Sequence, residues 1–178
     1  MLFGCKNSEK PPIQQTFQSF FEVVPRIETT SFYFCPRKLQ NLLNMATDIW
    51  IHVEYKSRKT GKWTYAYEAD GDRNYKLFGI LAGTRGDCRP LYDPRGLPGD
   101  ISDKSKKEYE DWGADTHTPS WLTTQELKEC LNTAIKRTKD SYRDEMKKWL
   151  KPYYELYEKM NEKETQGEPC RMIFWFDN

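Results

Sequence analysis

The sequence predicts an α+β fold in which a small antiparallel sheet is covered by helices. Two neighbouring runs within residues 48–68 alternate between apolar and polar side chains, as half-buried strands do. Residues 171–176 at the end of the chain are apolar on both faces, which is typical of a central strand. Between these runs lie capped segments whose apolar residues recur at helical spacing, and these helices must cover the sheet.

Composition limits the function before any motif is considered. The chain has 178 residues, with 28 Lys and Arg against 27 Asp and Glu, so its formal net charge is +1. A near-neutral chain of about one domain's length argues against a generic nucleic-acid or membrane-surface binder. No run approaches the roughly 20 apolar residues of a membrane helix, so we expect no membrane partner. Five cysteines without a C-x-x-C spacing predict reduced thiols and a cytoplasmic location.

The chain divides into two parts. Residues 1–44 carry five basic and three acidic residues and show no sustained period, so they are interpreted as an extension or small subdomain. A second methionine, Met45, precedes the first strong strand pattern. Residues 45–178 are therefore predicted to form the main α+β domain.

The first predicted strand covers residues 48–55 and alternates strictly. One face carries Ile49, Ile51, Val53 and Tyr55, and the other carries Trp50, His52 and Glu54. A turn at Thr60-Gly61 follows, and residues 62–68 then alternate again. The two runs predict an antiparallel hairpin, and the C-terminal strand is expected to pair with it.

Two short helices should follow the hairpin. Residues 75–82 have helical spacing, with Asp72 as the expected N-cap and Gly83 as the stop. A polar, proline-rich loop comes next. Ser102 should then cap a helix that runs through Trp112.

Two longer helices complete the prediction. Thr123 and Glu126 form a capping-box signature, and an apolar stripe follows it. Residues 139–163 predict one long helix that Pro152 kinks, with Tyr142 and Trp149 in its apolar stripe. Residues 114–121, which precede the capping box, are expected to form a loop.

That expected loop is the segment richest in chemistry. It places the carboxylate of Asp115, the imidazole of His117 and the hydroxyl of Ser120 beside the indole of Trp121. His117 is a candidate general base, with Asp115 orienting it. The alternatives are a ligand-binding loop, or a structural loop whose polar side chains satisfy its own backbone.

Several arginines flank the central loops, and guanidinium groups suit phosphates. Aromatic side chains nearby are suited to stacking on nucleobases. The alternative is a scatter of solvated arginines near an aromatic core. The predicted nucleotide pocket consists of Arg73, Tyr75, Arg85, Arg95, His117, Ser120 and Trp121.

No motif predicts a metal or a cofactor. His52-x-Glu54 has the H-x-E pattern of zinc deaminases, but the P-C-x-x-C that completes such a site is absent. We interpret these two residues as neighbours on one face of a half-exposed strand. Asp70-x-Asp72 is interpreted as a turn followed by a helix cap, and no phosphate-binding glycine loop is present.

Four motifs, in order, resemble those of a family of small, largely uncharacterised proteins encoded by phages and prophages. They are Arg73-Asn74-Tyr75-x-Leu77-Phe78-x-Ile80-Leu81-Ala82-Gly83-x-Arg85, Pro94-Arg95-Gly96-Leu97-Pro98-x-Asp100-x-Ser102, Asp115-x-His117-x-x-Ser120-Trp121-Leu122-Thr123 with Glu126-Leu127, and Phe174-Trp175-Phe176-Asp177-Asn178. The resemblance covers about residues 45–135 and 170–178. Residues 1–44 depart from the family pattern.

The resemblance implies a setting, the cytoplasm of an infected bacterial host, where small phage proteins often antagonise immunity. By analogy of setting, we expect a protein that binds and sequesters a small anionic nucleotide-type immune signal. The lack of a metal motif or nucleophile site favours binding over turnover. Two alternatives stay open: an enzyme that cleaves such a signal with His117, and an inhibitor that binds a host defence protein through residues 1–44. A homo-oligomer is also left open.

Overall fold

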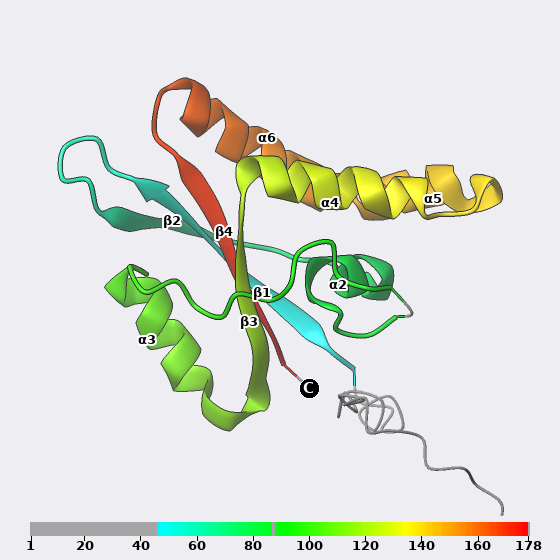
Figure 1. The fold of residues 1–178 in the computed structure, drawn as a ribbon, viewed down its shortest axis with the longest axis horizontal. Coiled ribbons are helices and arrows are strands. Elements are labelled where there is room, and N and C mark those ends of the chain that lie inside the picture. Colours follow the sequence, from blue (N-terminus) through cyan, green and yellow to red (C-terminus); the bar gives the residue numbers. More distant parts are fainter. Residues whose placement is uncertain (1–45, 87, 178) are drawn as a thin grey trace, which may run out of the picture. The chain divides into compact units, whose positions relative to one another are not determined.

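The computed structural model describes residues 46–86 and 88–177, so the prediction for residues 1–44 lies outside the described residues. Its strands form one antiparallel sheet in the order β2-β1-β4-β3, and helices accompany it, which confirms the α+β class (Figure 1). The elements are β1 (Asp48–Lys56), β2 (Trp63–Ala69), α2 (Tyr75–Ala82), α3 (Asp103–Trp112), η2 (Gly113–Asp115), β3 (Thr116–Thr123), α4 (Thr124–Lys136), η3 (Asp140–Tyr142), α5 (Arg143–Trp149), α6 (Lys151–Thr165) and β4 (Cys170–Asp177).

The predicted hairpin and the predicted central strand are both confirmed. β1 pairs with β2 on one side and with β4 on the other, and β3 pairs with the free side of β4. The β1–β4 register is continuous from Asp48 opposite Asp177 to Tyr55 opposite Cys170. β4 is buried from Cys170 to Phe176, because it has a neighbouring strand on each side and helices over both faces.

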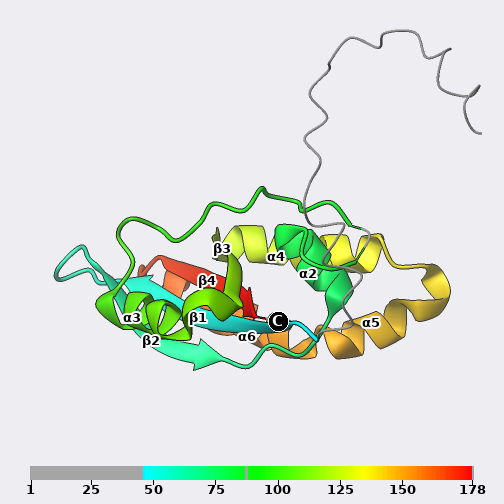
Figure 2. The same ribbon diagram turned by 90° about the horizontal axis from the view of Figure 1, so that it is seen from below.

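The sheet has two different faces. On one face, the apolar residues of β1 and β4 pack in a single hydrophobic core with residues of α2, α4, α5 and α6. The other face is covered by α3, whose Trp112 ring lies 4.4 Å from that of Trp50 and whose Tyr109 ring lies 5.5 Å from that of Trp175. We call this second face the α3 face; α3 lies apart from the other helices in both ribbon views (Figures 1 and 2).

One local prediction was wrong at β3. Residues 114–121 were expected to form a loop, but Thr116–Thr123 is an edge strand paired with β4. The register shifts between His117 and Ser120, where Thr118 has a φ of 52° and Pro119 follows. This bulge interrupts the alternation of side chains, so the sequence pattern does not look like a strand.

The segment between α2 and α3 protects this edge strand. The backbone N–H of Gly96 donates to the carbonyl of Pro119 at 3.1 Å, and that of Arg95 donates to Oγ of Ser120 at 3.1 Å. The segment thereby leads the chain from the core face to α3 on the other face (Figure 2). Covering an edge strand in this way removes a template for unwanted strand pairing.

The predicted long helix over residues 139–163 was also wrong. The helix is broken at Leu150, and Pro152 lies in the first turn of α6. Backbone N–H groups in the first turn have no carbonyl partner within the helix, so a proline is tolerated there. Tyr142, at the end of η3, and Trp149, at the end of α5, are 56% and 51% exposed, so neither lies in a buried stripe.

The helix caps were mostly predicted correctly. Ser102 caps α3, and Thr123 with Glu126 forms the capping box of α4. The exception is α2, because Asn74 rather than Asp72 accepts the hydrogen bond from the backbone N–H of Leu77, at 3.1 Å. None of the helices in the described residues combines the length and apolar character needed to cross a membrane.

Gly71 offers a test of the packing between the sheet and α6. A Cβ atom on Gly71 would lie 2.4 Å from Cγ2 of Ile49 and 3.2 Å from the hydroxyl of Tyr153. We expect Gly71→Ala to lower the free energy of unfolding by about 1–3 kcal/mol, since the core cannot take the extra methyl without shifting. Urea denaturation measures this change.

Gly99→Ala is the matched control, since a Cβ there meets no atom within 4 Å. Its free energy of unfolding should stay within about 0.5 kcal/mol of the wild-type value. Equal losses in the two variants would contradict the packing described for Gly71.

Candidate functional site

Three of the predicted pocket residues lie together at the edge strand. The guanidinium of Arg95 forms a two-armed ion pair with the carboxylate of Glu126, with Nη1 2.9 Å from Oε2. The same guanidinium lies 4.7 Å from the ring centroid of Trp121, while the Arg95 backbone contacts Ser120. This group fastens the α2–α3 segment to β3 and to the first turn of α4.

Two others contact residues at or just before the start of β1, and the third begins α2. Arg73 pairs with Asp48, with Nη2 2.6 Å from Oδ2, and Nε of Arg85 donates to Oγ1 of Thr47 at 2.7 Å. Tyr75 begins α2 and is 42% exposed. The Arg73 hydrogen bond holds the pKa of Asp48 below its ordinary value. Both Arg73 and Arg95 therefore neutralise carboxylates of their own chain.

The proposed acid–base residues lie at the beginning of β3. The imidazole of His117 stacks on Phe176 with ring centroids 5.9 Å apart, and its Nδ1 is 3.0 Å from Oγ1 of Thr118. Asp115 is exposed in the short η2 turn that precedes the strand. The enzymatic role assigned to these two residues stays a prediction.

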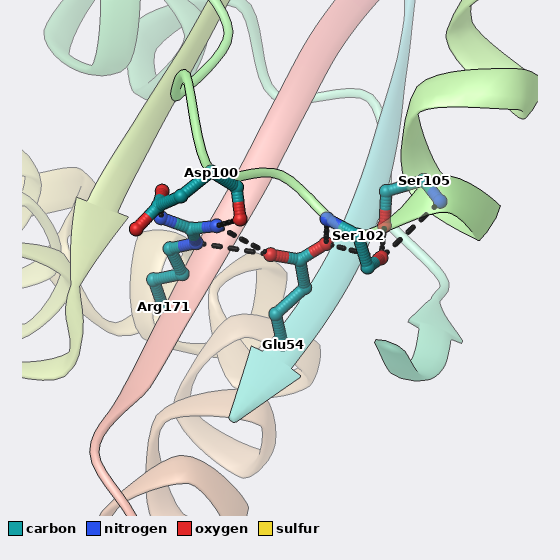
Figure 3. Close-up of polar contacts among 5 residues, drawn as sticks. All are labelled: Glu54, Asp100, Ser102, Ser105 and Arg171. Carbon is teal, nitrogen blue, oxygen red and sulfur yellow. Dashed lines mark hydrogen bonds and ion pairs between the residues drawn. The ribbon is translucent and has the colours of Figure 1, made fainter. Parts of the chain in front are cut away.

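The α3 face contains a buried polar network that the sequence did not reveal. Glu54 on β1 and Arg171 on β4 are 0% and 3% exposed, and Nη2 of Arg171 is 2.8 Å from Oε2 of Glu54 (Figure 3). Arg171 also contacts Asp100, with Nη1 2.6 Å from Oδ1. That hydrogen bond lowers the pKa of Asp100.

The same buried carboxylate also receives the start of α3. The backbone N–H of Ser102 donates to Oε1 of Glu54 at 3.0 Å, and the Ser102 hydroxyl donates to the same oxygen at 2.5 Å (Figure 3). Ser102 is the N-cap of α3, so Glu54 supplies negative charge where the helix dipole is positive. The network thus joins two central strands to the helix that covers them.

His52 and Glu54 were expected on a half-exposed strand, but both are fully buried, because α3 and the preceding loop cover them. Burial is the largest influence on His52 and lowers the pKa of its imidazole. Alternation correctly placed both side chains on one face and could not show that a distant helix covers it.

A cavity of about 580 Å³ lies beside this network, between β2 and the start of α3. Its lining combines aromatic rings, lysines, carboxylates and hydroxyls, and its volume is in the range of small-molecule sites. The lining residues are Gly61, Lys62, Trp63, Thr64, Tyr65, Asp100, Ile101, Ser102, Asp103 and Lys104. None of them was among the seven predicted pocket residues, although Trp63 and Tyr65 at alternate positions of a strand were a visible signal.

Comparison with known proteins identifies no relative. No protein-family model, no curated protein and no solved structure matches the chain.

The buried pair makes a clear stability prediction. Arg171→Met leaves the Glu54 carboxylate buried without its cation, and we expect a loss of about 3–5 kcal/mol in the free energy of unfolding. The double variant Arg171→Met with Glu54→Leu removes both charges and should recover a large part of the lost free energy of unfolding. A double-mutant cycle by urea denaturation measures the coupling, and strictly additive losses would contradict it.

The Arg95 group makes a prediction about pH. Burial raises the pKa of Glu126, but hydrogen bonds from Arg95 and Thr123 outweigh this and hold the pKa below its ordinary 4.5. A lowered folded-state pKa means that the stabilisation is complete above the ordinary pKa and is lost as pH falls through the folded value. We expect Glu126→Gln to cost about 1–2 kcal/mol at pH 7 and much less under acid conditions.

Urea denaturation at pH values from 7 to below the ordinary pKa checks this expectation. Glu110→Gln is the control, because its carboxylate is 62% exposed and 3.8 Å from Lys106. A Glu126→Gln deficit that does not shrink in acid would exclude the ionised carboxylate as its source.

Proposed function

We propose that the protein binds a small nucleotide-type ligand in the cavity between β2 and α3 and acts by sequestering it. The observation that carries the proposal is the lining of this cavity of about 580 Å³, to which two aromatic residues, two lysines and two aspartates contribute. Each of these groups matches a different part of a nucleotide.

The aromatic rings suit the base. Trp63 and Tyr65 are two residues apart on β2, so their side chains project to the same face of the sheet. Arg171 lies 4.0 Å from the ring centroid of Trp63 and His52 packs edge-on against Tyr65, which fixes both rings from behind. A base that stacks on such preorganised rings gains about 1–3 kcal/mol.

The charged groups suit the phosphate and the sugar. Lys62 has no ion-pair partner within the described part of the chain, whereas Nζ of Lys104 lies 2.8 Å from Oε2 of Glu108. Lys62 is therefore the cation that we expect to bind phosphate. Ammonium groups bind phosphate oxygens, whereas carboxylates such as Asp103 accept hydrogen bonds from ribose hydroxyls. A simple phosphate would leave the aromatic rings of the lining without a contact, so the mixed lining favours a nucleotide.

The biological role that we propose is supported by the resemblance of the four sequence motifs to those of small phage proteins. A phage protein that captures a nucleotide-type signal in the host cytoplasm would silence the immune response that the signal controls. Sequestration requires no reacting group, and the proposed cavity contains groups that bind each part of the ligand. Cleavage by His117 is a separate hypothesis, and the same experiment separates it from capture.

The test is a capture assay with the full chain. Purified protein is incubated with a panel of cyclic oligonucleotides and ADP-ribose derivatives, and mass spectrometry measures the free ligand and the ligand released by heating. We expect one compound to be depleted and recovered intact. Trp63→Leu and Lys62→Ala should each weaken capture about 5–100-fold, in keeping with the loss of one stacking or phosphate contact.

Lys107→Ala is the matched control, because this lysine is exposed on α3 and does not line the cavity. A product of altered mass would show that the protein converts the ligand chemically, and it would contradict sequestration. Capture that survives the two cavity variants but is lost in Arg95→Ala would place the ligand at the edge strand instead. Absence of capture for every compound would refute the proposal.

A further inference from the structure

Three side chains on the α3 face bring potential metal ligands together. His52 on β1 and Glu68 on β2 are directly opposite each other in the strand register, and Glu108 reaches them from α3. One ligand atom from each of the three lies within 4.8 Å of the others. Nε2 of His52 lies 3.6 Å from Oε1 of Glu108.

The environment of His52 points independently to a ligand at this cluster. Its side chain is 0% exposed, and within the described residues neither ring nitrogen has a hydrogen-bond partner. Buried polar groups are almost always hydrogen-bonded, and 3.6 Å is too long for such a bond. The indole N–H of Trp175, whose ring lies 4.8 Å from that of His52, is likewise buried without a partner in this part of the chain.

We propose that His52, Glu68 and Glu108 bind a divalent transition-metal ion, with Zn²⁺ as the best match. One imidazole nitrogen and two carboxylate oxygens form a donor set that zinc accepts. Ligand atoms bound tetrahedrally to zinc at about 2.1 Å lie about 3.4 Å apart, close to the His52–Glu108 separation. Glu68 is exposed, so its side chain can close the remaining gap.

The surroundings of Glu108 fit this role. Its two carboxylate oxygens have different neighbours: Oε1 faces His52, and Oε2 lies 2.8 Å from Nζ of Lys104. Lys104 therefore orients the carboxylate without using the oxygen that faces the cluster, as outer partners of metal ligands commonly do. Three protein ligands leave at least one coordination position for water or a ligand atom.

This inference is independent of the proposed nucleotide function, since metal binding is measured without any nucleotide. Lys104 and Tyr65 do connect the two places: both line the cavity, and they contact Glu108 and His52 respectively. A metal at the cluster would lie beside the cavity. Failure of either binding experiment leaves the other unaffected.

The experiment uses the full chain after removal of metals with a chelator. Isothermal titration with ZnCl₂ should give one site whose affinity falls at least about 100-fold in Glu68→Gln, because loss of even an outer partner costs 10–100-fold. Glu68→Gln is the deciding variant, since its exposed side chain can change without disturbing the core. Glu108→Gln should weaken binding similarly, and Glu110→Gln, exposed on the same helix, should not.

Three outcomes would overturn the proposal. They are the absence of zinc binding, zinc binding that is unchanged in Glu68→Gln, and saturation by Mg²⁺ as tight as that by Zn²⁺. The second outcome would assign the zinc to other residues, and the third would exclude the imidazole as a ligand. Visible absorption of the Co²⁺-loaded protein provides a further check, because it reports the metal ligands directly. This absorption should be lost in the His52→Asn variant, and an unchanged circular dichroism spectrum would show that the variant is folded.

Discussion

The carboxylate of Glu54 is buried in the middle of the sheet, where an unpaired negative charge would be very costly. Arg171 on the neighbouring strand supplies the opposite charge, and the N-cap residue Ser102 supplies two further hydrogen bonds. These requirements fix three elements at once: β1, β4 and the start of α3. A second sheet face is thereby covered by a single helix, although that helix is largely polar in sequence.

The proposed sites follow from this arrangement. The Glu54 network holds the start of α3 against the sheet, so the helix and β2 enclose the cavity lined by Trp63 and Tyr65. One turn further along, the same helix carries Glu108 over His52 and Glu68. A single charge-driven contact therefore positions both the groups suited to a nucleotide and the groups suited to a metal ion.

The arginines show how much a local sequence pattern leaves undecided. Arg73 and Arg95 were predicted to bind phosphate, but each pairs with a carboxylate of its own chain. In the case of Arg95 the pair with Glu126 also fastens the loop that protects the edge strand β3. A guanidinium occupied in this way stabilises the fold, and its exchange for a ligand phosphate would first break an internal ion pair.

The sequence by itself determined the α+β class, the hairpin, the central C-terminal strand and most helix caps, because periodicity and capping depend on residues close together along the chain. It missed β3, where the bulge at Thr118 and Pro119 breaks alternation, and the break at Leu150, where a proline fits equally well inside a kinked helix or at the start of a new one. The tertiary structure alone decided which charges meet. Glu54 and Arg171 are 117 residues apart, so no local sequence pattern relates one to the other. The candidate site depends on such distant pairings, because a pocket is formed where separate elements converge and no local spacing encodes that convergence.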